Sequence, residues 1–136
     1  MTLQVRITQE RWQLNEAFEI AGQVMTDLPL LLLELIDENG NMGRAEAAGI
    51  DYDGETPESM SDQLNSILPK LRSTTTPIDV QAWLPRGGAR NALDCALWDL
   101  RAKRSCKPAW STAGLEPMRP LTTACTIGLG TIDDTR

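Results

Sequence analysis

The sequence contains no histidine and few cysteine or aromatic residues, and these shortages exclude whole classes of chemistry. Without histidine the chain cannot build a histidine metal site, a Ser-His-Asp triad or an imidazole acid–base pair. The three cysteines, Cys95, Cys106 and Cys125, are odd in number and show no Cys-x-x-Cys spacing, so we expect neither a zinc site nor a disulfide framework. We predict free, buried thiols in a reducing cytoplasm.

Basic charge and long apolar runs are also scarce. The chain has 13 Lys and Arg against 19 Asp and Glu, a net charge of −6, which disfavours binding to nucleic acid because that normally requires a basic face. The longest apolar run, residues 30–33, is far shorter than the roughly 20 residues of a membrane span. The 136 residues, 41% of them apolar, suit one globular domain. We therefore predict a soluble, cytoplasmic protein with no nucleic-acid or membrane partner.

The first part of the chain predicts a three-stranded antiparallel meander. Apolar residues nearly alternate at the start of residues 3–14, the first expected strand. Residues 15–29 are irregular and are interpreted as a loop. Residues 30–38 form the second strand, with apolar residues on both faces, so we expect each face to meet protein. The Asn-Gly-Asn turn at 39–41 then leads into a third strand at 42–48.

Helical signals follow the meander. Thr56 and Pro57 are suited to begin a helix with an apolar face, and Thr76 and Pro77 begin a second helix that ends near Pro85. A third helix has the clearest amphipathic stripe, formed by Ala89, Ala92, Leu93, Ala96, Leu97 and Leu100.

The last residues predict the beginning of another unit. Residues 122–129 are typical of a strand, and residues 130–134 resemble the loop and cap that open a further helix. The chain ends at Arg136, before that helix could make two turns. We therefore expect this sequence to be the first part of a larger protein.

Charge is segregated along the chain. Residues 34–62 contain nine acidic residues and one basic residue, whereas residues 86–107 contain six basic and two acidic residues. The two segments either face each other in the fold or lie on separate solvated surfaces, and the second arrangement is the commoner one.

The most specific pattern lies between Leu84 and Lys103. This segment reads Leu-Pro-Arg-Gly-Gly-Ala-Arg-Asn-Ala-Leu-Asp-Cys-Ala-Leu-Trp-Asp-Leu-Arg-Ala-Lys. It closely resembles the last capping-domain helix of the enolase superfamily, in the muconate-lactonizing subgroup and especially its dipeptide epimerases. Three further features keep the order expected for that family: the turn and strand at 39–46, the loop at 52–56, and the strand from residue 122 to residue 128. The resemblance thus spans essentially the whole chain.

The resemblance implies an α+β fold in two parts. Residues 1–115 would form the capping domain, a meander followed by a helical bundle, and residues 116–136 would begin a truncated (β/α)₇β TIM-like barrel. In this family the barrel binds Mg²⁺ through three carboxylates, and its lysines remove and return the α-proton of a carboxylate substrate through an enediolate. The resemblance therefore implies a magnesium-dependent isomerase that acts on a dipeptide, with its own barrel as partner and a homo-oligomeric full-length form.

The catalytic residues and metal ligands of that family are expected beyond Arg136. The only lysines, Lys70, Lys103 and Lys107, do not form a Lys-x-Lys pair on a barrel strand. A single barrel strand cannot supply three metal-binding carboxylates. We therefore expect the 136-residue chain to be inactive on its own.

The resemblance assigns substrate specificity to two cap loops, here roughly residues 18–28 and 49–55. In epimerases that act on Ala-Glu, an arginine in the first loop pairs with the glutamate side chain, and the matching position here is Met25. A thioether cannot make that bidentate contact, and no Arg or Lys lies between Arg11 and Arg44 to replace it. This departure disfavours Ala-Glu as the substrate.

The remaining candidate contacts favour a dipeptide with an apolar or basic side chain. The second loop offers Asp51 and Asp53, which would select the basic one, and Met25 offers an apolar surface. The family's first barrel strand also contributes a threonine, matched here by Thr126. Alternatively, Asp51 and Asp53 are merely solvated loop acids and Thr126 only fills a strand.

Two further functional interpretations stay open. Within the superfamily, the same scaffold supports muconate cycloisomerisation, o-succinylbenzoate synthesis and N-succinylamino-acid racemisation. From a different class, the chain could be a non-catalytic binding module that kept only the cap. The solitary strand at 122–129 argues against that module, because its unpaired edges would promote association.

Overall fold

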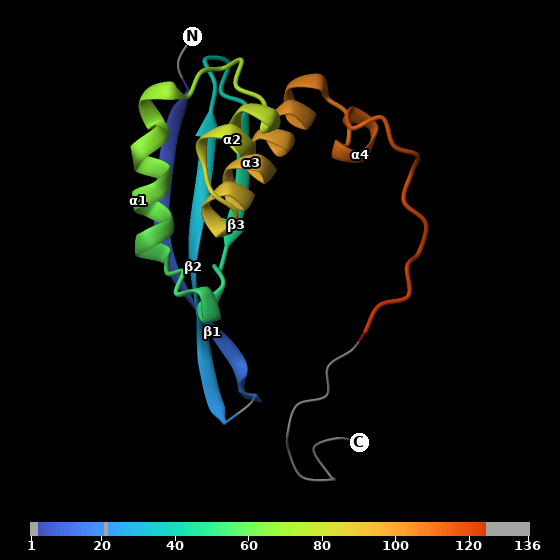
Figure 1. Cartoon of the computed structure of the whole chain (residues 1–136). Coiled ribbons are helices and arrows are strands. Elements are labelled where there is room, and N and C mark those ends of the chain that lie inside the picture. The colour runs from blue at the N-terminus through green and yellow to red at the C-terminus, as the bar shows by residue number, and fades with distance from the viewer. Residues whose placement is uncertain (1–2, 21, 125–136) are drawn as a thin grey trace.

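A computed structural model describes residues 3–20 and 22–124 of the chain. Three strands, β1 (Gln4–Ile20), β2 (Gln23–Ile36) and β3 (Met42–Ala47), form an antiparallel sheet in the order β1-β2-β3. The main helices lie on one face of this sheet (Figure 1). The predicted meander is confirmed, and the molecule has a sheet layer and a helical layer.

The helices begin where the sequence predicts. Thr56 and Thr76 are the N-caps of two of them; each side chain accepts a hydrogen bond from the third amide of its helix, and a proline occupies the first helical position. In chain order the helical elements are η1 (Asp51–Asp53), α1 (Pro57–Ile67), η2 (Leu68–Lys70), α2 (Pro77–Trp83), α3 (Gly88–Ser105) and α4 (Ala109–Thr112).

The core lies between β2 and the helices. Alternate leucines of β2 point toward the helical layer and are almost fully buried, and the predicted stripe of α3 is buried against the sheet. Three alanines in this stripe let the backbones of α3 and β3 approach closely. At the closest approach, Gly43 of β3 lies against Ala96 and Leu100 of α3, and a side chain there would overlap both.

The prediction of a loop over residues 15–29 is wrong. β1 continues to Ile20 and β2 already begins at Gln23, so the described residues of this range form the extended end of a long hairpin (Figure 1). The pairing changes register between Gln13 and Phe18. Most of this extension is exposed, and it therefore lacks the alternation of apolar residues that burial imposes on a strand.

The two faces of β2 are covered by different kinds of side chain. On the face away from the helices, Glu34 is buried, with 6% of its side chain exposed, and it pairs with Arg6 of β1 at 2.9 Å and with Arg44 of β3 at 2.8 Å. Two strands thus supply the charges that satisfy a carboxylate on the strand between them. Polar side chains, rather than a further protein layer, complete this part of the open face.

The acidic and basic segments of the chain do meet in the fold. Asp37, at the end of β2, accepts hydrogen bonds from the amides of Asn39 and Asn41 and forms an ion pair with Arg104 of α3, with Nε 2.8 Å from Oδ2. Arg104 also donates to the carbonyl of Ser73. One arginine therefore connects the β2–β3 turn, the loop before α2 and the end of α3.

The environment of Asp37 predicts acid-sensitive stability. Hydrogen bonds from Asn41 and from Arg104 hold the pKa of Asp37 well below its ordinary value of 3.8. Because the folded state favours the ionised carboxylate, this contribution to stability is present above the ordinary pKa and is lost as the pH falls below it. Chemical denaturation of wild type and Asp37→Asn between about pH 5 and about pH 2.5 should show a smaller acid-induced loss of unfolding free energy in the variant. An equal loss of unfolding free energy with falling pH in the two proteins would contradict this prediction.

The prediction of buried cysteines is wrong for the two cysteines that the structure describes. Cys95 and Cys106 are free, as expected, but both are exposed. Cys95 lies on the outer side of α3, away from the apolar stripe, and Cys106 follows the helix in a left-handed conformation, with φ of 51°. Cys125 lies outside the described residues.

The C-terminal predictions fall largely outside the described part of the chain. Residues 122–124 are not in a strand, and the remainder of the strand predicted at 122–129, with the helix opening at 130–134, lies outside the described residues. Among the described residues, no helix is long and apolar enough to cross a membrane.

Candidate functional site

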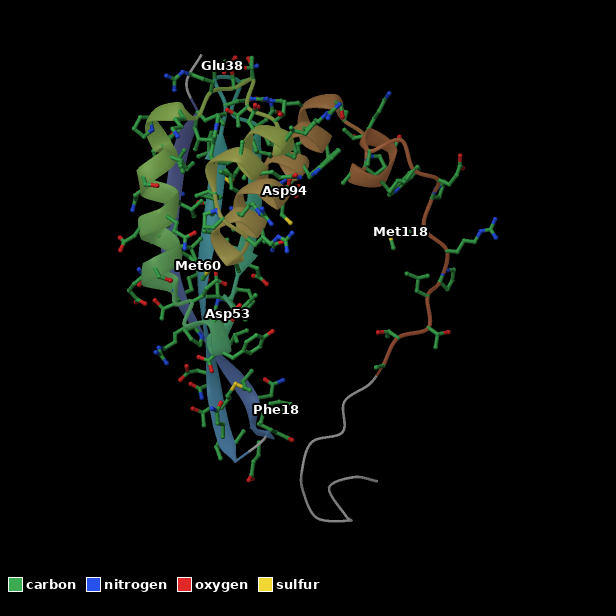
Figure 2. The ribbon with its side chains drawn as sticks, viewed as in Figure 1. Phe18, Glu38, Asp53, Met60, Asp94 and Met118 are labelled. Atoms are coloured by element: carbon green, nitrogen blue, oxygen red, sulfur yellow. The ribbon has the colours of Figure 1, made fainter. Side chains whose placement is uncertain are left out.

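A groove lies between the hairpin end and the segment that joins β3 to α1. Its volume is about 310 Å³. Phe18 and Asp53 mark this end of the molecule, and Glu38 marks the other (Figure 2). The lining residues are Gln23, Met25, Asp27, Leu28, Pro29, Ala48, Gly49, Asp51, Glu55, Thr56 and Pro57.

The groove brings together the two segments that the sequence singled out for specificity. Met25 of β2 and Asp51 of η1 both line it, although they are 26 positions apart in the sequence. Asp53 is exposed on the same 3-10 turn and is not among the lining residues. Thr126 lies outside the described residues, so its assignment stays a prediction.

Met25 is held by strand pairing rather than by a flexible loop. It pairs with Phe18 across the β1–β2 hairpin, beyond the register shift in β1. The residue is 36% exposed and lines the groove together with Leu28 and Pro29 of the same strand. This wall of the groove is therefore largely apolar, and a regular strand holds it in place.

One of the groove's acidic residues is already paired. Arg11 of β1 forms an ion pair with Asp27 of β2 across the hairpin. No Arg or Lys occurs between Arg11 and Arg44 in the sequence, but the hairpin brings Arg11 itself to the groove residue Asp27. Since Arg11 pairs with Asp27, the charge of Asp27 is balanced within the protein.

A second acidic residue, Glu55, is held by backbone amides. Its Oε2 accepts hydrogen bonds from the amide of Ile50 at 2.9 Å and from the amide of Gly88 at 3.0 Å, and its Oε1 accepts from Gly88 at 2.9 Å. Gly88 is the first residue of α3, where unpaired amides and the helix dipole favour a carboxylate. The sequence interpretation put Glu55 in a loop and gave it no role. The only local signal was the Thr-Pro helix start that follows it, which indicates a turn at this position.

With Asp27 and Glu55 satisfied, Asp51 is the lining carboxylate left to a ligand. Asp51 is exposed and begins η1, which ends at Gly54 in a left-handed conformation, with φ of 72°. The groove thus combines an apolar wall with one carboxylate at its edge. This arrangement suits an extended side chain with an apolar stem and either an apolar or a cationic end.

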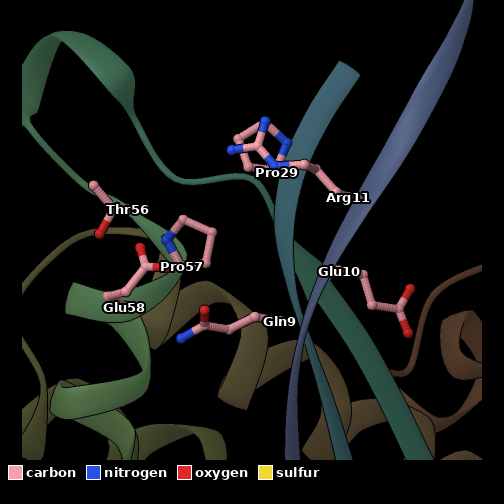
Figure 3. Close-up of a pocket in the computed structure, with 7 residues that line it drawn as sticks. All are labelled: Gln9, Glu10, Arg11, Pro29, Thr56, Pro57 and Glu58. Carbon is pink, nitrogen blue, oxygen red and sulfur yellow. The ribbon is translucent and has the colours of Figure 1, made fainter.

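A neighbouring groove lies on the other side of Pro29. It has a volume of about 370 Å³ and shares Pro29, Thr56 and Pro57 with the first groove. Figure 3 shows Arg11 at its upper edge and Glu10 directed away from Thr56. The ion pair between Arg11 and Asp27 therefore forms part of the wall between the two grooves.

The described residues do not fit a metal. Residues 3–20 and 22–124 contain no group of three or more His, Cys, Asp or Glu side chains that could hold a metal ion. No magnesium chemistry is therefore assigned to the side chains of this part of the chain.

Comparison with known proteins identifies the family. Residues 2–114 match the N-terminal domain of the mandelate racemase/muconate lactonizing enzyme family. The chain belongs to this family. The predicted resemblance is thereby confirmed: the meander followed by helices is the N-terminal cap of the enolase superfamily.

Two curated relatives of this cap are an epimerase and a racemase. The L-Ala-D/L-Glu epimerase of Escherichia coli strain K12 is 36% identical over 129 residues, which cover 95% of this chain and 40% of that enzyme. The N-acetyl-D-glutamate racemase of a Pseudoalteromonas species is 72% identical over 25 residues, covering 18% of this chain and 8% of that enzyme. The cap therefore spans about 40% of the length of the epimerase that it matches.

Solved structures support the same placement. An enolase family member from Agrobacterium tumefaciens, described as homologous to dipeptide epimerases and solved with sodium and L-Ala-L-Glu, is 30% identical with a TM-score of 0.86. The match covers 98% of this chain and 40% of that one. The dipeptide epimerase of Methylococcus capsulatus, complexed with Mg and L-Arg-D-Lys, shares the fold at 24% identity and a TM-score of 0.77, over 98% of this chain and 40% of that one.

Proposed function

We propose that this chain is the substrate-selecting cap of a dipeptide epimerase, with residues 1–115 forming the cap and residues 116–136 beginning the barrel. The observation that carries the proposal is the groove, because it joins the hairpin wall at Met25 to the turn at Asp51. Two similar proteins support the reaction class: an L-Ala-D/L-Glu epimerase, and an enolase family member described as homologous to dipeptide epimerases. In this proposal the cap binds and orients the substrate side chain, and the barrel removes and returns the α-proton.

Magnesium belongs to the barrel in this proposal. The solved epimerase that contains Mg and a dipeptide shares the fold of this cap, and the described residues hold no metal-binding cluster. The barrel-bound ion would stabilise negative charge on the substrate carboxylate. It follows that the 136-residue chain without the barrel is inactive. The proposal also includes a full-length protein that acts in the cytoplasm as a homo-oligomer.

The groove favours a dipeptide whose epimerised residue is apolar or basic. Met25 supplies an apolar contact, and Asp51 supplies the carboxylate that would select a cationic side chain. Arg11 pairs with Asp27 through one guanidinium nitrogen and is not among the residues that line the groove. In this proposal the chain differs in substrate preference from its 36% identical relative, which is an L-Ala-D/L-Glu epimerase.

The test is a dipeptide screen of the full-length protein with Mg²⁺, with α-proton exchange in D₂O followed by NMR. We expect exchange at a residue with an apolar or basic side chain, with the basic residues preferred. A preference for Glu or Asp at the exchanging position would refute this substrate class. An absence of exchange with every dipeptide would refute the function itself.

Racemisation of an N-acylated amino acid is the second candidate. The 25-residue segment that is 72% identical to an N-acetyl-D-glutamate racemase favours it. Adding N-acetyl and N-succinyl amino acids to the same screen distinguishes the two functions, since a dipeptide carries an ammonium group that these substrates lack.

Arginine at position 25 is expected to shift the specificity toward Ala-Glu. Met25→Arg would place a guanidinium on the apolar wall, where it can pair with a substrate carboxylate. The ratio of kcat/KM for Ala-Glu to that for Ala-Leu should rise about tenfold or more, as expected for a charge-assisted hydrogen bond.

Val24→Arg is the matched control for this substitution. Val24 adjoins Met25 but is not among the residues that line the groove. An arginine at position 24 therefore adds the same charge outside the site. An equal change in both variants, or an unchanged ratio in Met25→Arg, would show that position 25 does not contact the substrate side chain.

A further inference from the structure

We propose that Glu55 is a positioning residue that clamps the second specificity segment, residues 49–55, to the first turn of α3 and thereby fixes Asp51 in the groove. The inference rests on the proposed function in one respect, namely that this groove takes the substrate side chain. Glu55 itself lines the groove, but both of its carboxylate oxygens already accept hydrogen bonds from the protein. Its role is therefore to hold other groups in place.

The segment is first closed on itself by its own backbone. The amides of Asp53 and Glu55 both donate to the carbonyl of Ile50, at 3.0 and 3.2 Å, and the amide of Gly54 donates to the carbonyl of Asp51 at 2.9 Å. These bonds shape a compact turn but do not attach it to the rest of the protein. The Glu55 carboxylate provides that attachment, because it accepts from Ile50 within the segment and from Gly88 on α3.

The helix that receives the clamp is the best anchored one. α3 packs on β3 and β2 through a buried stripe, so its first turn is anchored to the sheet that also carries Met25. A carboxylate at that turn gains from the unpaired amides and the helix dipole. The two walls of the groove are thus tied to one body.

The glycine pair before α3 leaves room for the carboxylate. A Cβ at Gly87 would overlap Oε1 of Glu55 and lie 2.9 Å from its Cδ, and the φ of 146° at Gly87 disfavours any side chain. A Cβ at Gly88 would overlap Sδ of Met60 and lie 3.2 Å from Cα of Gly49, the first residue of the segment. The Gly-Gly sequence therefore allows the segment, the carboxylate and the helix start to come together.

The clamp is tested directly by amide hydrogen exchange in the 136-residue chain. Glu55→Gln keeps the shape but replaces one acceptor oxygen with an NH₂ group that cannot accept, and Glu55→Ala removes both acceptors. We expect exchange at the amides of Ile50 and Gly88 to accelerate about tenfold or more in Glu55→Ala, with a smaller effect in Glu55→Gln. The amide of Leu97, in the buried part of α3, should be unaffected.

Glu38→Gln is the matched control, since Glu38 is exposed at the opposite end of the sheet (Figure 2). It should leave the exchange rates at Ile50 and Gly88 unchanged. Unchanged rates at these amides in both Glu55 variants would overturn the proposal. Loss of protection at Leu97 as well would also overturn it, because Glu55 would then support the whole fold rather than one segment.

The consequence for specificity is tested in the full-length protein. For the preferred dipeptide, Glu55→Ala should raise KM about tenfold with kcat changed less than about twofold, since no reacting atom loses a contact. The preference for Ala-Lys over Ala-Leu should fall, because Asp51 is no longer held at the groove. A lower kcat with unchanged KM, or an intact preference, would overturn the positioning role.

Failure of the proposed function gives a different result. If the wild-type full-length protein epimerises no dipeptide, the proposed function is wrong. The exchange rates at Ile50 and Gly88 then still decide whether Glu55 holds the segment, because they do not depend on turnover.

Discussion

Replacing Gly43 with alanine is expected to lower the free energy of unfolding by about 3 kcal/mol, near the upper end of the usual cost of overpacking. The added Cβ would overlap the carbonyl oxygen of Ala96 and lie 2.6 Å from Cβ of Leu100. Both atoms belong to α3, and one is backbone, so no side-chain rotation can relieve the contact. The helix would have to move away from β3, with loss of core packing. Urea denaturation followed by circular dichroism measures the effect.

Gly40→Ala separates this steric effect from backbone strain. Gly40 has a φ of 80°, and a Cβ there would meet no atom within 4 Å, so its substitution costs only the left-handed conformation, about 1 kcal/mol. Gly43 has no such φ, and its larger cost would come from contact alone. Equal costs at the two positions would show that α3 and β3 do not pack as closely as described.

Truncating Leu33 to alanine is expected to cost about 3 kcal/mol. Leu33 lies in the central strand, only 1% exposed, between the sheet and the helical layer. Removal of its side chain loses the transfer free energy of the buried methyl and methylene groups and leaves a cavity that close-packed neighbours fill only partly. Thermal and urea denaturation should both report the loss.

Leu28→Ala is the control for Leu33→Ala. Leu28 lies on the same strand but is 39% exposed, in the hairpin extension, so its truncation should cost less than about 1 kcal/mol. A similar cost at the two leucines would mean that the core is not centred on the part of β2 that faces the helices.

The hydrophobic pattern was a reliable guide wherever the chain is buried. The stripe on α3 and the capped starts at Thr56 and Thr76 were predicted correctly, because burial and capping leave local signatures in the sequence. The hairpin extension was missed because exposed strands need no alternation of apolar residues. Cys95 and Cys106 were wrongly predicted to be buried, because composition does not tell which positions of a fold are covered.

The candidate site was only partly predictable for the same reason. The sequence identified Met25 and Asp51 through the family resemblance, but the ion pair of Arg11 with Asp27 joins residues on opposite strands of a hairpin. Such contacts depend on strand register, and no register could be predicted because residues 15–29 were interpreted as a loop.

The sequence by itself determined the family and the order of strands and helices, and it singled out the two candidate specificity segments, because these depend on local patterns and on a distinctive helix motif. Only the tertiary structure decided which acidic residues remain available to a ligand. Asp27 is paired across the hairpin and Glu55 is bound to amides of its own segment and of α3, which leaves Asp51. The physical reason is that a carboxylate's availability depends on donors brought to it by folding, and these donors are distant in the chain.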